Sequence, residues 1–284
     1  ETVTVTGTWA KNSYTITYYL SYEDQAEGNV YDTQTVKFGE KVELIGAEVP
    51  GNIFDGWDLE VDTMPAENLE AVAVLTPKVV YFYSIYEEVI FTMEEVDEIT
   101  EADLPSAEDA TEGEDVNFIE WQINDETLET PYAVDSAEVE VYPYCTVDIV
   151  FYTDEDCETV YETLTFEYGY EITEEDIAAI GEPTKKGNTF ACWEFDFVYQ
   201  SAESNSETYA IYDANVYEAT FIVNGEVYDT KEVTFGEAIE LPETAPAKEG
   251  YTFIGWTDVE GGKTAITLPA TMPAVSSLTC YAIF

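Results

Sequence analysis

The chain has 284 residues, 45% of them hydrophobic, which is enough for packed cores and excludes a disordered acidic tail. Sixty-one acidic residues face nine lysines, with no arginine or histidine, giving a formal net charge of −52. Such a surface repels nucleic acid and anionic lipid, so neither is an expected partner, and no apolar run reaches the about 20 residues of a membrane-spanning helix.

The chain opens with a strand-like segment and then a repeated motif. Residues 1–10 include VTVTGTWA, which resembles the closing strand of a unit and is interpreted as the end of a preceding repeat. Residues 30–40 (VYDTQTVKFGE) and 227–237 (VYDTKEVTFGE) share eight of eleven positions. Each copy is followed by Phe-x-Gly-Trp and then by Met-Pro-Ala, so the order of three motifs indicates duplication.

Two fainter copies lie between these. They read FIEW at residues 118–121 and FACW at residues 190–193, and successive tryptophans are 64, 72 and 63 residues apart. The predicted repeats are residues 11–77, 78–145 (diverged), 146–214 and 215–284, with short linkers such as residues 76–78 and 213–216. The structural landmarks are Phe54, Trp57, Phe118, Trp121, Phe190, Trp193, Phe253 and Trp256.

Short helices are predicted in the middle repeats. An acidic stretch over residues 100–110 has Thr100 as its candidate cap, and VEVYPYC at residues 139–145 is the closing strand of its repeat. In the third repeat, Thr173 precedes acidic residues and IAAI, and Gly181 follows, which predicts a helix of about two turns.

The fourth repeat is the clearest. Strands are predicted at residues 217–223 and 226–235, joined by Asn224-Gly225, because a tight hairpin turn needs positive φ at both central residues. Residues 241–250 are predicted to be a loop, and further strands follow at residues 251–256 and 278–284. The expected fold is α+β and strand-dominated, with four small tandem units in an elongated array.

A family resemblance rests on this repeat. Its PAKEGYTFIGW at residues 246–256 and closing LTCYAIF are similar to the Listeria–Bacteroides repeat, the B-repeat type of internalin B. The third repeat keeps most of the motif as PTKKGNTFACW, and the second keeps little. The resemblance implies a β-grasp-like fold and tandem display on a secreted or cell-wall-attached protein. It carries no catalytic residues.

The repeated tryptophans have two interpretations. A residue at the same place in every unit is expected to be buried in a core, and we favour this. A row of exposed tryptophans would instead stack on sugars. In a regular strand the landmark phenylalanine and tryptophan would point to opposite faces, so either one is partly exposed or a bulge intervenes.

Metal chemistry is limited to calcium. Without histidine, the usual general base and the commonest metal ligand are missing. Asp154, Asp156 and Glu158 form an acidic turn that could contribute oxygen ligands, although no complete calcium-binding loop is present and a solvated turn is the simpler interpretation. We expect no enzyme activity, no other cofactor and mostly unpaired cysteines.

These observations favour a non-catalytic stalk or spacer of an adhesin, located outside the cell or on its wall. One alternative is a binding module that engages a host surface protein or a glycan through exposed aromatic side chains. Another is a self-assembling fibre in which terminal strands pair with a neighbouring chain, so the chain is either a monomer or part of an end-to-end fibre.

Overall fold

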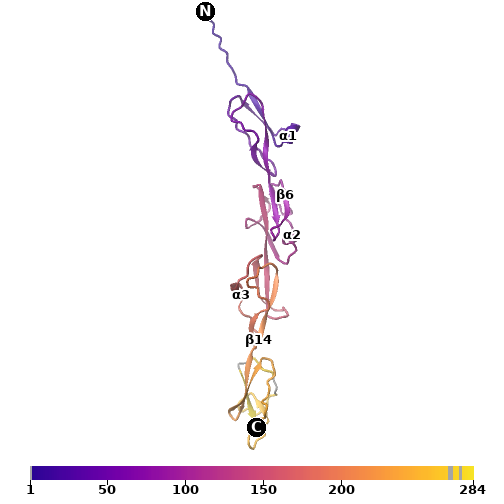
Figure 1. Ribbon diagram of the computed structural model, residues 1–284, viewed down its shortest axis with the longest axis vertical. Helices are drawn as coiled ribbons and strands as arrows, with labels where there is room; N and C mark the ends of the chain where they lie inside the picture. The colour runs from indigo at the N-terminus through magenta and orange to yellow at the C-terminus, as the bar shows by residue number, and fades with distance from the viewer. Residues whose placement is uncertain (1, 268–270, 275–276) are drawn as a thin grey trace. The chain divides into compact units, whose positions relative to one another are not determined.

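The computed structural model describes residues 2–267, 271–274 and 277–284 (Figure 1). Residue 1, in the predicted end of a preceding repeat, and residues 268–270 and 275–276, in the fourth predicted repeat, lie outside the described residues. The chain divides into two compact units, Glu1–Thr146 (unit 1) and Val147–Phe284 (unit 2). Strands dominate both units and helices are short, which agrees with the predicted α+β class.

The first sheet of unit 1 has the strand order β2-β1-β4-β3. Its two central strands, β1 and β4, are parallel, and each edge strand is antiparallel to its neighbour. Helix α1 joins β1 to β2, beginning after the cap Ser21 and ending at Gly28. The bounds are β1 Ser13–Tyr19, α1 Tyr22–Glu27, β2 Asp32–Lys37, β3 Asn52–Trp57 and β4 Leu69–Pro77.

Two parallel central strands, each paired with one edge strand, form a strand pattern that recurs in the second half of unit 1. Strand β5 is antiparallel to β6 and parallel to the start of β11, and β8 is antiparallel to β11. Short β9 pairs with β8, and β7 pairs with β10. The bounds are β5 Val79–Tyr83, β6 Val89–Glu94, β7 Glu98–Ile99, β8 Asn117–Ile123, β9 Glu126–Thr127, β10 Tyr132–Ala133 and β11 Glu138–Tyr152.

The acidic stretch of the second predicted repeat forms two short turns instead of one helix. A 3₁₀ turn, η1 (Glu101–Asp103), is capped by Thr100, as predicted, and helix α2 (Ala107–Thr111) is capped separately by Ser106. Pro105 explains the break, because the residue before a proline is pushed out of the helical region. Leu104 accordingly has an extended backbone with ψ of 128°.

Unit 2 contains the pattern twice more. In its first half β14 is parallel to the end of β11, β13 is antiparallel to β14, and β12 pairs with β11. Helix α3 begins after Thr173 and ends at Gly181, so that prediction is confirmed. The bounds are β12 Val160–Glu167, α3 Glu174–Ile180, β13 Asn188–Trp193 and β14 Ser206–Ala214.

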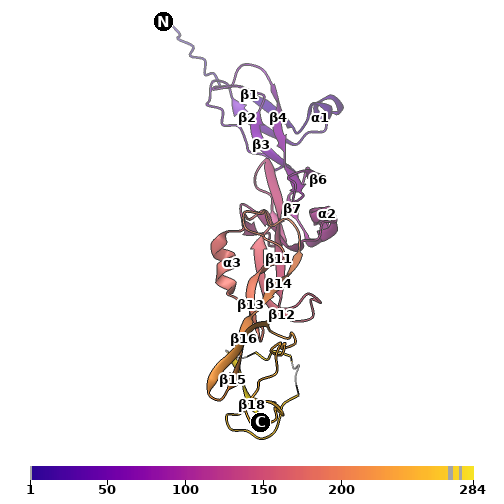
Figure 2. The same cartoon turned by 60° about the horizontal axis from the view of Figure 1, so that its bottom comes forward.

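The second half of unit 2 has the order β16-β15-β18-β17, with β15 and β18 parallel (Figure 2). The predicted hairpin is confirmed: Asn224 and Gly225 have φ of 52° and 85° and join β15 to β16. The bounds are β15 Val216–Val223, β16 Glu226–Thr234, β17 Gly255–Thr257 and β18 Ser277–Ile283.

The predicted third strand of this repeat, residues 251–256, is wrong in its bounds, because β17 starts only at Gly255. In the first sheet, Asn52 and Ile53 pair with Pro77 and Thr76, which follow Leu75 in β4. The counterpart of Leu75 is Phe284, whose ring contacts that of Phe253, and the amide of Ile254 donates to the carbonyl oxygen of Ile283 at 2.8 Å.

Two other strand boundaries differ from the predictions. The closing strand predicted to end at Cys145 continues without a break to Tyr152 as β11, and alternate residues from Cys145 to Phe151 stay buried. The predicted linkers also shrink to single residues: only Lys78 separates β4 from β5, and only Asn215 separates β14 from β15. The described residues 2–10 form no strand.

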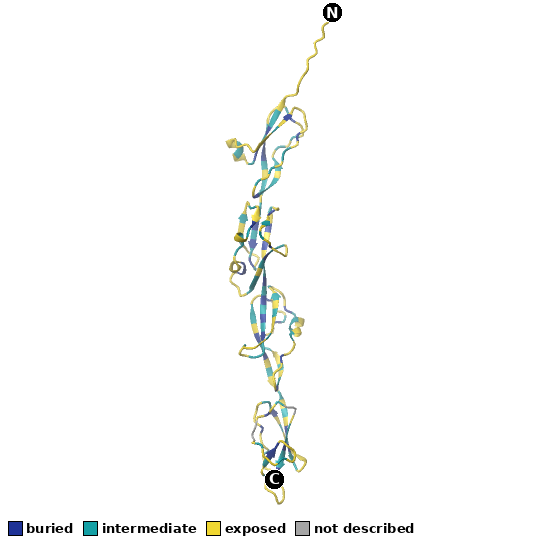
Figure 3. Cartoon of the chain, turned by 180° about the vertical axis from the view of Figure 1, so that it is seen from behind, coloured by how far each residue is buried: buried dark blue, intermediate teal, exposed yellow. Residues whose placement is uncertain are grey.

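Each pattern encloses its own small core (Figure 3). Buried side chains lie on alternate positions of the central strands, as the period-two pattern of the sequence requires. The most deeply buried large side chains, one from each pattern in chain order, are Tyr18, Phe82, Phe151 and Phe221.

Candidate functional site

The landmark phenylalanine and tryptophan of each predicted repeat meet edge to face. The ring centroids are 5.1, 5.5, 5.2 and 5.4 Å apart in chain order, and the interplanar angles are 65°, 63°, 61° and 67°. The register shifts between Phe54 and Gly56 and between Phe190 and Cys192. These bulges bring the two rings to the same face, one of the two possibilities left open by the sequence.

The tryptophans are covered to different extents. Trp121 and Trp256 are only 5% exposed, whereas Trp57 and Trp193 are half-buried. The indole Nε1 of Trp57 donates a hydrogen bond to the carbonyl oxygen of Ile45 at 2.6 Å. The burial of Trp121 and Trp256, together with the ring contacts of all four tryptophans inside their repeats, argues against a row of stacking platforms for sugars.

A second aromatic cluster lies in unit 1. Tyr83 and Tyr142 stack with their centroids 4.6 Å apart and their planes 8° from parallel. The hydroxyl of Tyr83 donates to Glu140 Oε1 at 3.1 Å. Burial, followed by this hydrogen bond and the carboxylate charge, raises the pKa of Tyr83 to about 12. Burial, followed by the negative charge of Glu140, also raises the pKa of Tyr142.

The acidic turn proposed for calcium is closed by its own hydrogen bonds. Asp154 Oδ1 accepts from the amide of Glu158 at 3.0 Å, and Asp154 Oδ2 accepts from the hydroxyl of Thr153 at 3.1 Å. The amide hydrogen bond is the main reason that the pKa of Asp154 is lowered. Asp156 and Glu158 are exposed. Within the part of the chain that the structure describes, no three acidic or cysteine side chains form a cluster suited to a metal ion.

The four cysteines are free thiols. Cys145 and Cys280 are buried, Cys157 is half-buried and Cys192 is exposed. Burial raises the pKa of Cys145 to about 11, so this thiol stays protonated at neutral pH and is a weak nucleophile.

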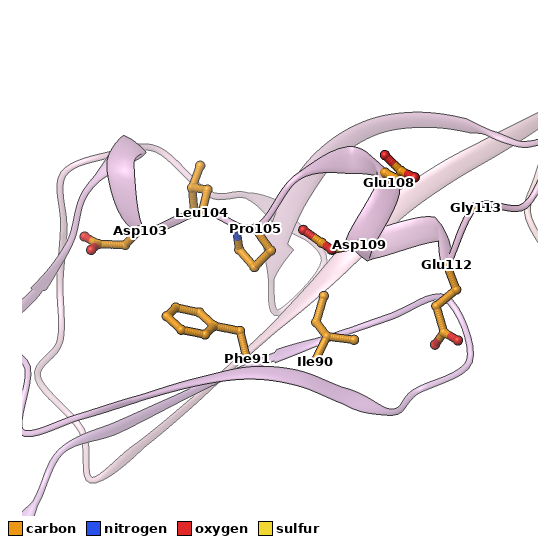
Figure 4. A pocket seen from close by; sticks show the side chains of 9 residues that line it. All are labelled: Ile90, Phe91, Asp103, Leu104, Pro105, Glu108, Asp109, Glu112 and Gly113. Carbon is orange, nitrogen blue, oxygen red and sulfur yellow. The ribbon is translucent and has the colours of Figure 1, made fainter.

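A groove in the second predicted repeat was not anticipated from the sequence (Figure 4). It has a volume of about 680 Å³. Ile90 and Phe91 of β6 form one wall, and Leu104 and Pro105 lie in the wall facing them. Phe91 is 44% exposed, so part of its ring is open to solvent.

Acidic side chains surround this groove, and two of them are held by helix caps. Asp103 Oδ2 accepts from the amide of Thr100 at 2.8 Å and also from its hydroxyl, and these bonds lower the pKa of Asp103. Asp109 Oδ2 accepts from the hydroxyl of Ser106 at 2.6 Å. Glu108 and Glu112 complete the acidic lining.

The chemistry available in the groove is recognition. An apolar wall beside carboxylates suits a ligand with a positive charge and an apolar body. One sequence signal for it was the adjacent pair Ile90 and Phe91, since neighbouring strand residues normally face opposite sides. The register shift between Phe82 and Tyr83, opposite this pair, lets both line the groove.

None of the helices in the described part of the chain is both long and apolar enough to cross a membrane.

Comparisons with known proteins place one part of the chain in a family. Residues 217–283 match the model of the Listeria-Bacteroides repeat domain. The chain is 35% identical to internalin H of Listeria monocytogenes over 111 residues, which cover 36% of this chain and 20% of that protein. It is 33% identical over 98 residues to a protein of Evansella cellulosilytica named "Putative membrane protein", covering 30% of this chain and 15% of that one. The chain therefore contains a Listeria-Bacteroides repeat domain at residues 217–283 and has a segment of 111 residues that is 35% identical to internalin H.

Proposed function

We propose that the chain is a non-catalytic repeat region of a secreted or cell-wall-attached surface protein, where it acts as the stalk or spacer of an adhesin. The family match at residues 217–283 and the similarity to internalin H support this class of protein. The strong negative charge supports an exposed, highly solvated surface.

We also infer that the four predicted repeats are tandem β-grasp-like units. Each has two parallel central strands with one further strand paired on either side. The second predicted repeat, whose sequence keeps few of the motifs, retains this strand arrangement through β5, β6, β8 and the start of β11. Strand pairing supports a common fold where residue identity has faded.

The observation that carries the spacer proposal is the way strands run from one predicted repeat into the next. A single residue, Lys78 or Asn215, stands between the closing strand of one pattern and the opening strand of another. Joins this short restrict the rotation of neighbouring repeats far more than flexible linkers do. A stiff array is the property that a spacer requires.

Small-angle X-ray scattering of the purified chain tests this proposal. With roughly 30–40 Å for each of the four predicted repeats, a stiff array has a maximum dimension of roughly 120 Å or more. We expect this dimension to be the same with millimolar calcium and with a chelator. A globular particle would contradict the spacer proposal. Lengthening that requires calcium would instead assign a role to the acidic turn at Asp154, Asp156 and Glu158.

A second candidate function is a binding module, and the groove at Phe91 favours it. Its exposed aromatic ring and apolar wall offer a surface for a peptide or protein, and Glu108 and Glu112 select for positive charge. Under this proposal the partner presents a lysine or arginine next to an apolar side chain. A neutral glycan fits such a lining less well.

A short peptide containing lysine and phenylalanine can serve as the probe. Binding is followed by the shift of the backbone amide signals of Phe91 and Ala110 on titration. Phe91→Ala should abolish the shifts, whereas Val89→Ala, on the same strand and 50% exposed, is the matched control. Amide shifts that persist in Phe91→Ala would rule out the groove as the binding site. The absence of any shift in the wild-type chain at low salt would rule it out as well.

A further inference from the structure

A short chain of backbone hydrogen bonds joins the two halves of unit 2. The amide of Asn215, the single joining residue, donates to the carbonyl oxygen of Gly187 at 2.9 Å. The carbonyl oxygen of Asn215 accepts from the amide of Phe235 at 2.8 Å. The side chain takes part as well, because Thr189 Oγ1 donates to Asn215 Oδ1 at 2.6 Å. The glycine turn of the third predicted repeat is thereby fixed against the fourth.

The same arrangement is found in unit 1 with different residues. The amide of Lys78 donates to the carbonyl oxygen of Gly51 at 2.9 Å, and the amide of Glu95 donates to the carbonyl oxygen of Lys78 at 2.9 Å. Asp97 adds two bonds, since its Oδ1 accepts from the amide of Gly51 at 3.0 Å and from Lys78 Nζ at 2.9 Å. Sequence identity at the joining position is lost, but the backbone pattern is kept.

Both glycines are tightly enclosed by the following repeat. Gly187 and Gly51 are buried and have φ of +77° and +71°. A Cβ on Gly187 would lie 2.5 Å from ring atoms of Phe235, and a Cβ on Gly51 would lie 2.1 Å from the carbonyl oxygen of Glu95. Only a residue without a side chain allows this close approach.

The fourth predicted repeat carries the same turn in an open setting. The amide of Tyr251 donates to the carbonyl oxygen of Lys248 at 3.1 Å, as the amide of Asn188 does to Lys185 at 3.0 Å. Gly250 has φ of +81°, but it is exposed, and a Cβ there would meet nothing within 4 Å. Gly250 therefore has the backbone conformation of Gly187 without the contact.

The first predicted repeat shows the accepting side of the contact. The amide of Phe38 donates to the carbonyl oxygen of Asn12 at 2.9 Å, the same bond that joins Phe235 to Asn215. Phe38 is 48% exposed, whereas Phe235, beneath Gly187, is half-buried. The aromatic ring of the Phe-Gly-Glu motif is thus free of the core and available as a surface on which a glycine turn can rest.

We propose that the glycine turn of a repeat is a docking element and that the joining residue and the residue at the Phe-Gly-Glu position of the following repeat form its docking surface. Asn215 with Phe235, and Lys78 with Glu95, are occupied surfaces of this kind. Asn12 with Phe38 has the same geometry, and the partner that it fits is the glycine turn of another repeat. The docking holds whether the region is a spacer or a binding module.

Amide hydrogen exchange on the full chain tests the proposal, with Gly187→Ala and Gly250→Ala as a matched pair. Both substitutions place alanine at a similar positive φ, so the strain of the turn itself is the same in both. Only Gly187→Ala adds a clash with the next repeat. We expect the Asn215 amide to exchange about tenfold faster in Gly187→Ala and to be unchanged in Gly250→Ala.

A third variant separates docking from a general loss of folding. Phe235→Ala removes the ring that the new methyl group would strike, so adding Gly187→Ala to Phe235→Ala should cause little further acceleration. Phe38→Ala, the counterpart at the exposed surface, should leave the Asn215 amide unchanged. Equal acceleration in Gly187→Ala and Gly250→Ala would overturn the proposal. A full additional effect of Gly187→Ala in the Phe235→Ala background would overturn it as well, even if Gly187→Ala alone unfolds unit 2.

Discussion

The ring of Phe253 meets the ring of Trp256 edge to face, with the centroids 5.4 Å apart and the planes 67° from parallel. Trp256 also contacts Phe221, a buried residue of the central strand β15, at 4.8 Å between centroids. The landmark pair is thus the point where an edge strand is fixed to the core of the repeat. Edge-to-face contacts of this kind add to the stabilisation that burial of the rings provides.

Trp256→Ala should destabilise unit 2 by about 3–5 kcal/mol, the usual cost of removing a large buried aromatic side chain. Chemical denaturation followed by far-ultraviolet circular dichroism measures the change. Trp9→Ala is the control, because Trp9 is 98% exposed and its removal should leave the transition unchanged. Similar effects of the two substitutions would contradict a core role for Trp256.

The raised pKa of Tyr83 predicts a loss of stability in alkaline solution. Its pKa is about 12 in the folded chain, above the ordinary value of 10.0. A folded pKa above the unfolded one means that this contribution is fully present below pH 10 and is lost as the pH rises towards 12. The near-ultraviolet absorbance of tyrosinate should therefore show one late-titrating tyrosine fewer in Tyr83→Phe than in the wild type, although other tyrosines such as Tyr142 also have raised pKa values. A wild-type titration curve unchanged by Tyr83→Phe would refute this prediction.

The helix cap at Thr173 predicts a linked change in stability and titration. Thr173 Oγ1 donates to Asp176 Oδ2 at 2.7 Å, the largest cause of the lowered pKa of Asp176. Thr173→Val removes this donor and should cost about 1 kcal/mol, as lost caps usually do. Because the folded pKa is lowered, the contribution of Asp176 is present above its unfolded pKa and lost as the pH falls through the folded value.

Nuclear magnetic resonance titration of the Asp176 carboxyl carbon can follow this effect. The pKa should rise in Thr173→Val towards the ordinary aspartate value and stay low in Thr173→Ser, which retains the hydroxyl. An unchanged pKa in Thr173→Val would show that another contact, such as the hydroxyl of Tyr170 at 3.2 Å, controls this carboxylate.

The net charge of −52 predicts that salt stabilises the chain. Self-repulsion among carboxylates opposes the folded state, and at about 0.15 M ionic strength the Debye length falls to about 8 Å. We expect the unfolding temperature to rise by roughly 4 °C or more between very low and physiological ionic strength. The gain should be equal in sodium and potassium chloride if screening causes it. A fall in stability with salt would mean that ion pairs such as Lys78 with Asp97 outweigh the repulsion.

Local sequence patterns specify several secondary-structure elements of this chain. Asn224-Gly225 specified the hairpin, Thr173 and Gly181 specified the ends of α3, and alternation of apolar residues specified the central strands. These features depend on neighbouring residues, whose backbone preferences and hydrogen bonds act over a few positions.

The way in which those elements meet depends on contacts between distant parts of the chain. The bulges that turn Phe54 and Trp57 to one face depend on the register with β4, a strand formed by residues 69–77. The groove at Phe91 and the docking of Gly187 on Phe235 likewise depend on segments far apart in the sequence. Register and close approach are set by long-range pairing and packing, so a local pattern such as the adjacent Ile90 and Phe91 indicates an irregularity but does not specify the contact that results.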